Sequence, residues 1–330
     1  MKVAVFSTKP HDEEFLPAGM PEISHEFVFF QNQLRAETAS LAEGCDAVCV
    51  FVNDDLSADC QEKLKEMGIR LIVLRCAGFN NVDLQAANDL GMVVLRVPEY
   101  SPYAVAEYAL AMLMTLNRHI HKAYSRVRDG NFALKGLMGF DLHGKTVAVI
   151  GTGKIGIVFC RILAGFGVKI LAYDPVPNSE LESLGVQYRA LEELWQEADV
   201  ISLHCPLTPE TCHLIDDASL ELCKNGVFLV NTSRGGLVDT AAAVKHLKGG
   251  KIGGLALDVY EEEAGLFFEN LSDEVIADDM LMRLTTFSNV LITSHQAFFT
   301  REALERIASV TIGNLSAFER GDKTFENQVT

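Results

Sequence analysis

Three groups of side chains that can bind an anion or transfer a proton follow short apolar runs in the second half of the chain. They are Arg234 within Asn231-Thr232-Ser233-Arg234-Gly235-Gly236, the acidic run Asp258-Val259-Tyr260-Glu261-Glu262-Glu263, and His295 within Ser294-His295-Gln296-Ala297. The runs before them, 227–230, 255–257 and 290–293, have the composition of buried strands. Because parallel strands end at one ligand-facing edge of a sheet, we expect an arginine, an acid and a histidine to gather there.

This trio has the chemistry needed to reduce an α-keto acid. The fork of Arg234 can hold a carboxylate through two hydrogen bonds and polarise the neighbouring carbonyl. His295 can give a proton to the developing alkoxide while a hydride reaches the carbon. A carboxylate beside the histidine can hold it in one tautomer and stabilise its charged form.

Each member of the trio also has a simpler interpretation. Arg234 could pair with a surface acid, and a run of three glutamates is usually a solvated face. Spacing does not choose among Glu261, Glu262 and Glu263. Among the other histidines, only His204, before Cys205-Pro206 at an expected strand end, is a candidate for lining a cofactor pocket.

A glycine-rich segment predicts where that cofactor binds. Residues 145–156 read Lys-Thr-Val-Ala-Val-Ile-Gly-Thr-Gly-Lys-Ile-Gly, with an expected strand at 146–150 before the glycines and an expected helix at 155–166 after them. Gly151 allows a tight turn, Gly153 admits a pyrophosphate to the backbone, and Gly156 lets the helix approach the strand. The helix N-terminus offers N–H groups and a positive dipole end to the phosphates.

Asp174, at the end of the next expected strand, indicates which dinucleotide binds. Its carboxylate can accept hydrogen bonds from the adenosine ribose hydroxyls and would repel the 2′-phosphate of NADP. No arginine follows it directly, since the next residues are Pro175-Val176-Pro177. The sequence therefore predicts NAD as the cofactor.

The elements that must position these residues alternate between apolar strands and helices, which predicts an α/β fold with parallel sheets covered on both faces. The expected strands are 47–52, 70–74, 93–97, 146–150, 169–173, 200–204, 227–230 and 290–293, and the expected helices include 58–67, 84–90 and 155–166. The pattern occurs twice, which suggests two doubly wound units with a cleft between them. An apolar segment at 104–127 predicts one long helix that either packs between domains or forms a subunit interface.

Composition narrows the class of protein. The 330 residues suffice for two domains, and 48% hydrophobic with 22% charged residues is typical of a globular chain. A net charge of −17 argues against nucleic-acid and anionic-membrane partners. No apolar run reaches the ~20 residues of a membrane span, and the first residues are expected to form a strand and not a signal peptide. Eight cysteines without a C-x-x-C pair predict buried reduced thiols, no metal site and a cytoplasmic location.

The motifs of this chain and their order closely resemble those of the D-isomer-specific 2-hydroxyacid dehydrogenases. In chain order, these motifs are the glycine fingerprint, Asp174, and the runs 204–208, 231–235, 258–261 and 295–297. The resemblance covers essentially the whole chain, including the substrate loop at 74–83. Within that family the runs 51–55, 75–81 and 266–268 are most similar to the D-lactate dehydrogenases of fermenting bacteria.

The resemblance implies a role for each site residue. Arg234 binds the substrate carboxylate and carbonyl, His295 is the acid/base, and Glu263 is its partner among the three glutamates. The implied substrate contacts are the main chain of Ala77 and Gly78 and the side chains of Tyr100 and Phe298. The implied cofactor contacts are Gly151, Gly153, Lys154, Ile155, Gly156, Asp174, His204, Cys205, Pro206, Thr232, Ser233 and Asp258, the last at the nicotinamide amide.

The resemblance also implies two Rossmann-like domains, with an NAD-binding domain at 101–298 inserted into a substrate domain made of 1–100 and 299–330. It implies reversible reduction of pyruvate to D-lactate by NADH, and assembly as a homodimer or homotetramer. Phe51, Tyr100 and Phe298 would make a small apolar pocket that suits pyruvate. Glyoxylate, hydroxypyruvate and 2-ketobutyrate stay open as substrates, and an NAD(H)-sensing corepressor is the alternative class, against which the complete Arg, Glu and His set argues.

Overall fold

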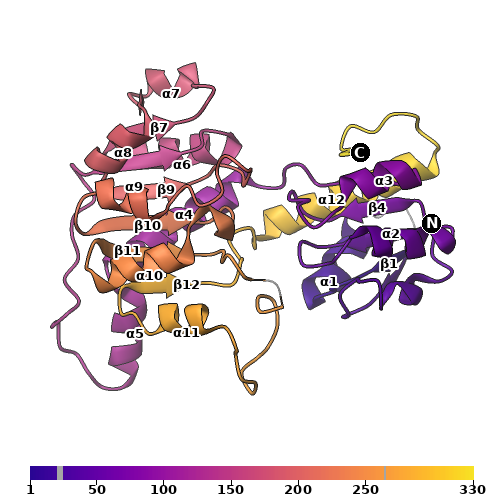
Figure 1. The fold of residues 1–330 in the computed structure, drawn as a ribbon, viewed down its shortest axis with the longest axis horizontal. Helices are drawn as coiled ribbons and strands as arrows, with labels where there is room; N and C mark the ends of the chain where they lie inside the picture. Colours follow the sequence, from indigo (N-terminus) through magenta and orange to yellow (C-terminus); the bar gives the residue numbers. More distant parts are fainter. Residues whose placement is uncertain (21–24, 264) are drawn as a thin grey trace. The chain divides into compact units, whose positions relative to one another are not determined.

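The computed structural model describes residues 1–20, 25–263 and 265–330. The chain forms two compact units, one made of Met1–Ser101 with Phe299–Thr330 and the other of Pro102–Phe298 (Figure 1). The second unit is thus inserted into the chain of the first.

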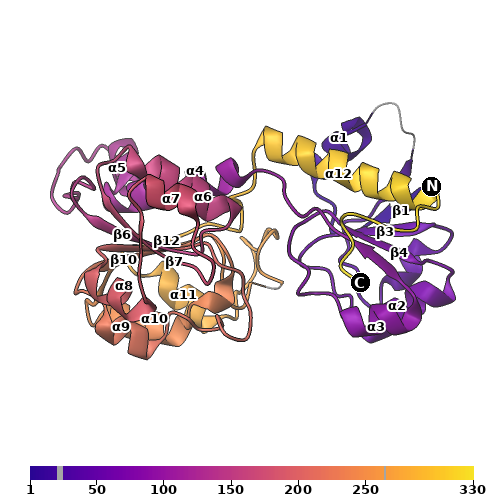
Figure 2. The same ribbon diagram turned by 90° about the horizontal axis from the view of Figure 1, so that it is seen from above.

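The sheet of the first unit, in the described residues, has five parallel strands in the order β2-β1-β3-β4-β5. They are β1 (Lys2–Val5), β2 (Glu26–Phe29), β3 (Ala47–Val50), β4 (Leu71–Leu74) and β5 (Val93–Leu95). The helices α1 (Pro10–Ala18) and α12 (Arg301–Glu319) cover one face, and η1 (Ala39–Ala42), α2 (Ala58–Glu66) and α3 (Leu84–Leu90) cover the other (Figure 2). Successive side chains of β3 and β4 enter opposite cores, which is why these strands are apolar throughout.

The sheet of the second unit has, within the described part of the chain, seven parallel strands in the order β12-β11-β10-β9-β6-β7-β8. They are β6 (Thr146–Ile150), β7 (Lys169–Tyr173), β8 (Gln187–Tyr188), β9 (Val200–Leu203), β10 (Val227–Asn231), β11 (Ile252–Leu257) and β12 (Val290–Ile292). Chain order reverses between β6 and β9, and ligands of doubly wound sheets bind at the carboxyl edge beside such a reversal. The predicted α/β class with two parallel sheets is confirmed.

Helices cover both faces of this second sheet (Figure 2). Its first face carries α4 (Pro102–Asn117), α6 (Lys154–Ala164) and α7 (Ser179–Ser183). Its second face carries α8 (Leu191–Glu197), α9 (Asp217–Leu222), α10 (Thr240–Lys248) and α11 (Asp279–Thr285).

The prediction of one helix over 104–127 is wrong. The helix α4 ends at Asn117, and α5 (Ile120–Arg128) starts after His119, whose φ is +51°. The reason is a long-range contact, because the Asn117 side chain bonds both the N–H and the carbonyl of Phe140 at 2.9 Å. The two halves also differ in burial: α4 packs on α6 and the sheet, whereas α5 has no buried residue.

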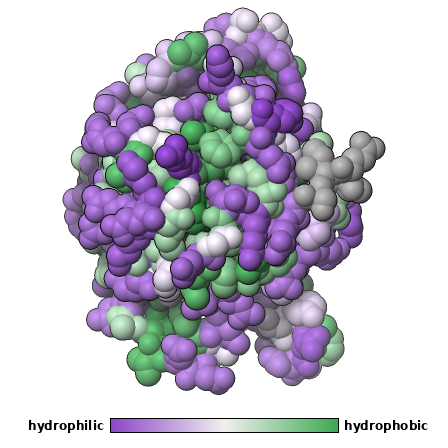
Figure 3. All heavy atoms as spheres, turned by 90° about the vertical axis from the view of Figure 1, so that its right-hand side faces the viewer, coloured by the Kyte–Doolittle hydropathy of each residue, from purple (hydrophilic) through white to green (hydrophobic). Residues whose placement is uncertain are grey.

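Two further expectations concern the absence of a membrane span and the burial of the cysteine thiols. No helix in the described ranges combines the length and the apolar character needed to cross a bilayer. The face of the molecule in Figure 3 is mostly hydrophilic, with apolar side chains gathered near its centre. All eight cysteines are free thiols, and Cys212 is the exception to the predicted burial.

Candidate active site

The carboxyl edge of the second sheet brings the predicted acid and histidine together. Nδ1 of His295, just after β12, lies 2.8 Å from Oε1 of Glu263, in the loop after β11. Their side chains are 18% and 26% exposed, so a substrate can reach the pair. With Nδ1 donating to the carboxylate, Nε2 is the nitrogen that can exchange a proton.

The structure also separates the three glutamates. The second carboxylate oxygen of Glu263 accepts the N–H of Tyr260 at 3.1 Å, which fixes the carboxylate next to His295. Glu261 instead pairs with the imidazole of His213 and accepts the N–H of Thr240, and Glu262 is exposed. The choice that spacing left open thus falls on Glu263.

Asp258 fixes the loop that carries the histidine. It is fully buried, and its carboxylate accepts hydrogen bonds from the Thr293 hydroxyl at 2.6 Å and from the N–H groups of Gln296 and Ala297 at 2.9 and 2.8 Å. Its carbonyl also accepts the N–H of His295 at 2.6 Å. The predicted contact of Asp258 with the nicotinamide amide stays a prediction.

Arg234 follows β10, the strand next to β11 in the sheet. The Asn231 side chain closes its turn by accepting the N–H of Ser233 at 3.0 Å and donating to the Arg234 carbonyl at 2.8 Å. Over the described residues, no carboxylate lies within ion-pair distance of Arg234, so its guanidinium is not used by a surface acid. A Cβ on Gly235 would lie 2.0 Å from the carbonyl oxygen of Tyr260, and only glycine lets the arginine loop lie against the acidic loop.

The glycine fingerprint has the shape of a phosphate cradle. Gly151 has a φ of +93°, and a Cβ there would lie 2.6 Å from the nitrogen of Cys205. A Cβ on Gly156 would lie 2.0 Å from the carbonyl oxygen of Gly151, whereas one on Gly153 would meet nothing within 4 Å. The open side at Gly153 is also the N-terminus of α6, which begins at Lys154 and continues with Ile155. These residues therefore fit a dinucleotide pyrophosphate.

Asp174 directly follows β7 and is hydrogen-bonded to the glycine turn. Its carboxylate accepts the N–H groups of Thr152 at 2.7 Å and Val176 at 2.9 Å. The residue is half-buried, which leaves the carboxylate able to meet a ribose as well.

The main chain of the segment 204–206 lies against the glycine turn, next to Gly151. The His204 ring turns inward, 2.9 Å from the Ser202 hydroxyl and 4.7 Å between centroids from Phe159. Burial lowers the pKa of His204 to about 3, so the ring is neutral and does not attract a phosphate. A contact of His204 with a cofactor would therefore come from its backbone, next to Cys205 and Pro206.

The turn at Thr232 and Ser233 lies next to the glycine cradle and has a side chain that fits a cofactor contact. The Ser233 hydroxyl donates to the Cys205 carbonyl at 2.6 Å, which ties the turn to the segment beside the cradle. The Thr232 hydroxyl is buried and has no hydrogen-bond partner among the described residues. A buried hydroxyl usually has one, so Thr232 fits a contact with bound cofactor.

The predicted substrate contacts Ala77, Gly78 and Tyr100 belong to the first unit, and Phe298 ends the second. The Ala77 carbonyl accepts a hydrogen bond from Arg96 at 2.8 Å, which orders the loop. Their approach to Arg234 and His295 stays a prediction.

Sequence reasoning gave no role to Phe268, whose ring centroid lies 5.8 Å from that of His295. Neither its residue type nor its spacing indicates this contact.

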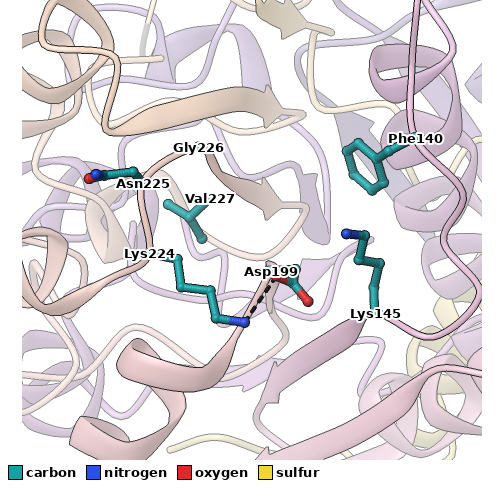
Figure 4. A pocket seen from close by; sticks show the side chains of 7 residues that line it. All are labelled: Phe140, Lys145, Asp199, Lys224, Asn225, Gly226 and Val227. Atoms are coloured by element: carbon teal, nitrogen blue, oxygen red, sulfur yellow. Dashed lines mark hydrogen bonds and ion pairs between the residues drawn. The ribbon is translucent and has the colours of Figure 1, made fainter.

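A separate pocket of about 200 Å³ lies at the opposite, amino edge of the second sheet (Figure 4). It is lined by Phe140, Lys145, Asp199, Lys224, Asn225, Gly226 and Val227. Both lysines of the pocket already interact with other side chains, since Lys224 forms an ion pair with Asp199 at 3.0 Å and the Lys145 ammonium lies over the Phe140 ring. It contains none of the predicted site residues.

Known proteins resemble this chain over its full length. Residues 110–297 match the family model of the D-isomer specific 2-hydroxyacid dehydrogenase NAD binding domain. The chain is 55% identical over 322 residues to the D-lactate dehydrogenase of Escherichia coli, and the match covers 98% of each chain. It is 53% identical over 329 residues to a 2-hydroxyacid dehydrogenase homolog of Haemophilus influenzae, and that match covers 100% of this chain and 99% of the other.

Solved structures agree with the sequence comparison. The apo-structure of D-lactate dehydrogenase from Escherichia coli matches with a TM-score of 0.92 at 52% sequence identity. The structure of D-lactate dehydrogenase with NAD+ from Lactobacillus jensenii matches with a TM-score of 0.82 at 31% sequence identity. Each match covers 100% of both chains. The motifs, the fold and these matches together establish that the chain belongs to the D-isomer specific 2-hydroxyacid dehydrogenase family.

Proposed function

We propose that this protein is an NAD-dependent D-lactate dehydrogenase that reversibly reduces pyruvate to D-lactate. The observation that carries the proposal is the 2.8 Å pair of His295 and Glu263, at the same sheet edge as Arg234, which has no carboxylate partner among the residues that the structure describes. The names of the similar proteins support pyruvate as the keto acid and NAD as the cofactor.

The side chains divide the reaction between them. Arg234 binds the substrate carboxylate and draws electron density from the adjacent carbonyl. Bound NADH supplies the hydride that the carbonyl carbon accepts. His295 starts this step as an imidazolium, which the Glu263 carboxylate stabilises. It gives its Nε2 proton to the alkoxide oxygen and becomes neutral. In the reverse direction, neutral His295 takes the proton from the hydroxyl of D-lactate.

The direct test measures NADH oxidation at neutral pH with pyruvate, glyoxylate, hydroxypyruvate, 2-ketobutyrate and a bulky phenyl keto acid. We expect the highest kcat/KM for pyruvate and a product of D configuration. A higher kcat/KM for another acid would replace the substrate and keep the family. Tight NADH binding without turnover of any of them would favour a corepressor-like role.

Asp174→Ala is expected to relax the preference for NADH over NADPH. Two unit charges ~4 Å apart repel by about 1 kcal/mol in water and more near a protein surface, so the kcat/KM ratio should change at least about fivefold. The measurement is kcat/KM for both cofactors with pyruvate. Asp174→Asn is the matched control, because it removes the charge and can still accept the Thr152 N–H. An unchanged ratio in both variants would remove Asp174 from the ribose site.

We further propose a homodimer, alone or paired into a tetramer, in the cytoplasm. Large apolar side chains are exposed on α5 and the loop after it: Tyr124 (64%), Phe132 (76%), Leu134 (83%) and Met138 (90%). Several large exposed apolar side chains in one segment are typical of an interface, and a second copy would cover them. The seven buried reduced thiols agree with a reducing compartment.

The double variant Leu134→Asp with Met138→Asp is expected to lower the molar mass in light scattering towards the 36.2 kDa of one chain. Buried charges without partners oppose association. Val275→Asp is the matched control, because Val275 is 95% exposed in a different loop. An unchanged molar mass in the double variant, or the same loss in the control, would place the interface elsewhere.

A further inference from the structure

Phe268 has an uncommon backbone conformation next to the proposed acid/base. Its φ is +69°, in the left-handed region, which is sterically unfavourable for a bulky side chain. His295 is also left-handed, with a φ of +52°. Their rings contact each other with centroids 5.8 Å apart and planes inclined by 36°. Backbone strain of this kind persists only where the surrounding structure imposes it, and it concentrates at functional sites.

The loop that carries Phe268 is built on Glu263 itself. The carbonyl of Glu263 accepts the N–H groups of both Leu266 and Phe267 at 3.1 Å. Phe267 is buried in the core, where its ring lies 6.5 Å from that of Tyr260. With Phe267 anchored inside, the left-handed turn at the next residue directs Phe268 to the imidazole.

We propose that Phe268 is a positioning residue for His295. Its half-buried ring packs against the imidazole, restricts ring rotation and shields the 2.8 Å bond between Nδ1 and Glu263 from water. Catalytic geometry is sensitive to such support, because a displacement of ~1 Å can cost about 10²-fold in rate. The consequence for turnover rests on the proposed function, whereas the consequence for the Nδ1–H bond does not.

The variants Phe268→Gly and Phe268→Tyr separate the ring from the backbone. Glycine adopts a φ of +69° without strain, so Phe268→Gly keeps the loop conformation and loses the ring. Tyrosine keeps the ring. Phe287→Ala is a matched control, because it removes a partly buried aromatic ring that packs on the same core cluster and contacts Arg283.

We expect Phe268→Gly to lower kcat with pyruvate roughly 10- to 100-fold, with the KM for pyruvate and the Kd for NADH within about twofold of wild type. The solvent deuterium isotope effect on kcat should rise, because proton donation by His295 becomes limiting. Phe268→Tyr should restore kcat to within about threefold, and Phe287→Ala should leave it unchanged. A wild-type kcat in Phe268→Gly, or a loss that tyrosine does not restore, would overturn the proposal.

A second measurement needs no substrate. In the protein without cofactor, the Nδ1 proton of His295 is followed by NMR and assigned by its loss in His295→Gln. We expect it to exchange with water at least about tenfold faster in Phe268→Gly than in wild type or Phe268→Tyr. Equal exchange rates would overturn the proposal even if turnover fell. Faster exchange in a protein that reduces none of the keto acids would support Phe268 and contradict the proposed function.

Discussion

Replacing His295 with alanine should lower kcat for pyruvate reduction by about 10²- to 10⁴-fold, which is the usual contribution of a general acid. The imidazole is the group at this sheet edge with a nitrogen free to give a proton once Nδ1 is bound to Glu263. The Kd for NADH, measured by fluorescence titration, should change less than about twofold, because the glycine cradle lies at the ends of other strands.

Two comparisons make this result interpretable. Glu263→Gln keeps a hydrogen-bond acceptor for Nδ1 and removes the charge, so its loss of kcat should be smaller than that of His295→Ala. The unfolding midpoint of each variant reports whether the loop held by Asp258 is still ordered. Equal losses of turnover and NADH binding in His295→Ala would make this histidine structural.

Arg234→Lys should raise the KM for pyruvate and lower kcat/KM about 10- to 150-fold, because lysine keeps the charge but loses the bidentate fork. One hydrogen bond to a charged group contributes ~1.5–3 kcal/mol, which corresponds to that range. Lysine also lacks the planar geometry that matches a carboxylate. Steady-state kinetics with pyruvate at saturating NADH measures the change.

The matched control is Arg189→Lys, which makes the same substitution at an exposed arginine paired with Glu193. It should leave both kinetic constants unchanged. If Arg234→Lys also left KM unchanged, Arg234 would not bind the substrate carboxylate. A proportional loss of NADH binding would place it at the cofactor instead.

Much of the fold followed from local pattern. The apolar runs 71–74, 146–150, 169–173 and 227–230 are strands because parallel sheets bury both faces, and the glycine fingerprint forms the expected turn because its steric demands are local. Strand ends differed by one or two residues, as at β9, which stops at Leu203 before His204. The expected strands did not include β2, whose four side chains are exposed or only partly buried, or β8, which has two residues.

The sequence by itself determined the parallel α/β architecture, the family and the set of residues from which a site is made. Only the tertiary structure decided that Glu263 and not Glu261 pairs with His295, that Asn117 and Phe140 end α4, and that Phe268 packs on the imidazole. The physical reason is the same in each case. These outcomes depend on contacts between distant segments and on left-handed backbone angles imposed by packing, which no residue type or spacing along the chain encodes.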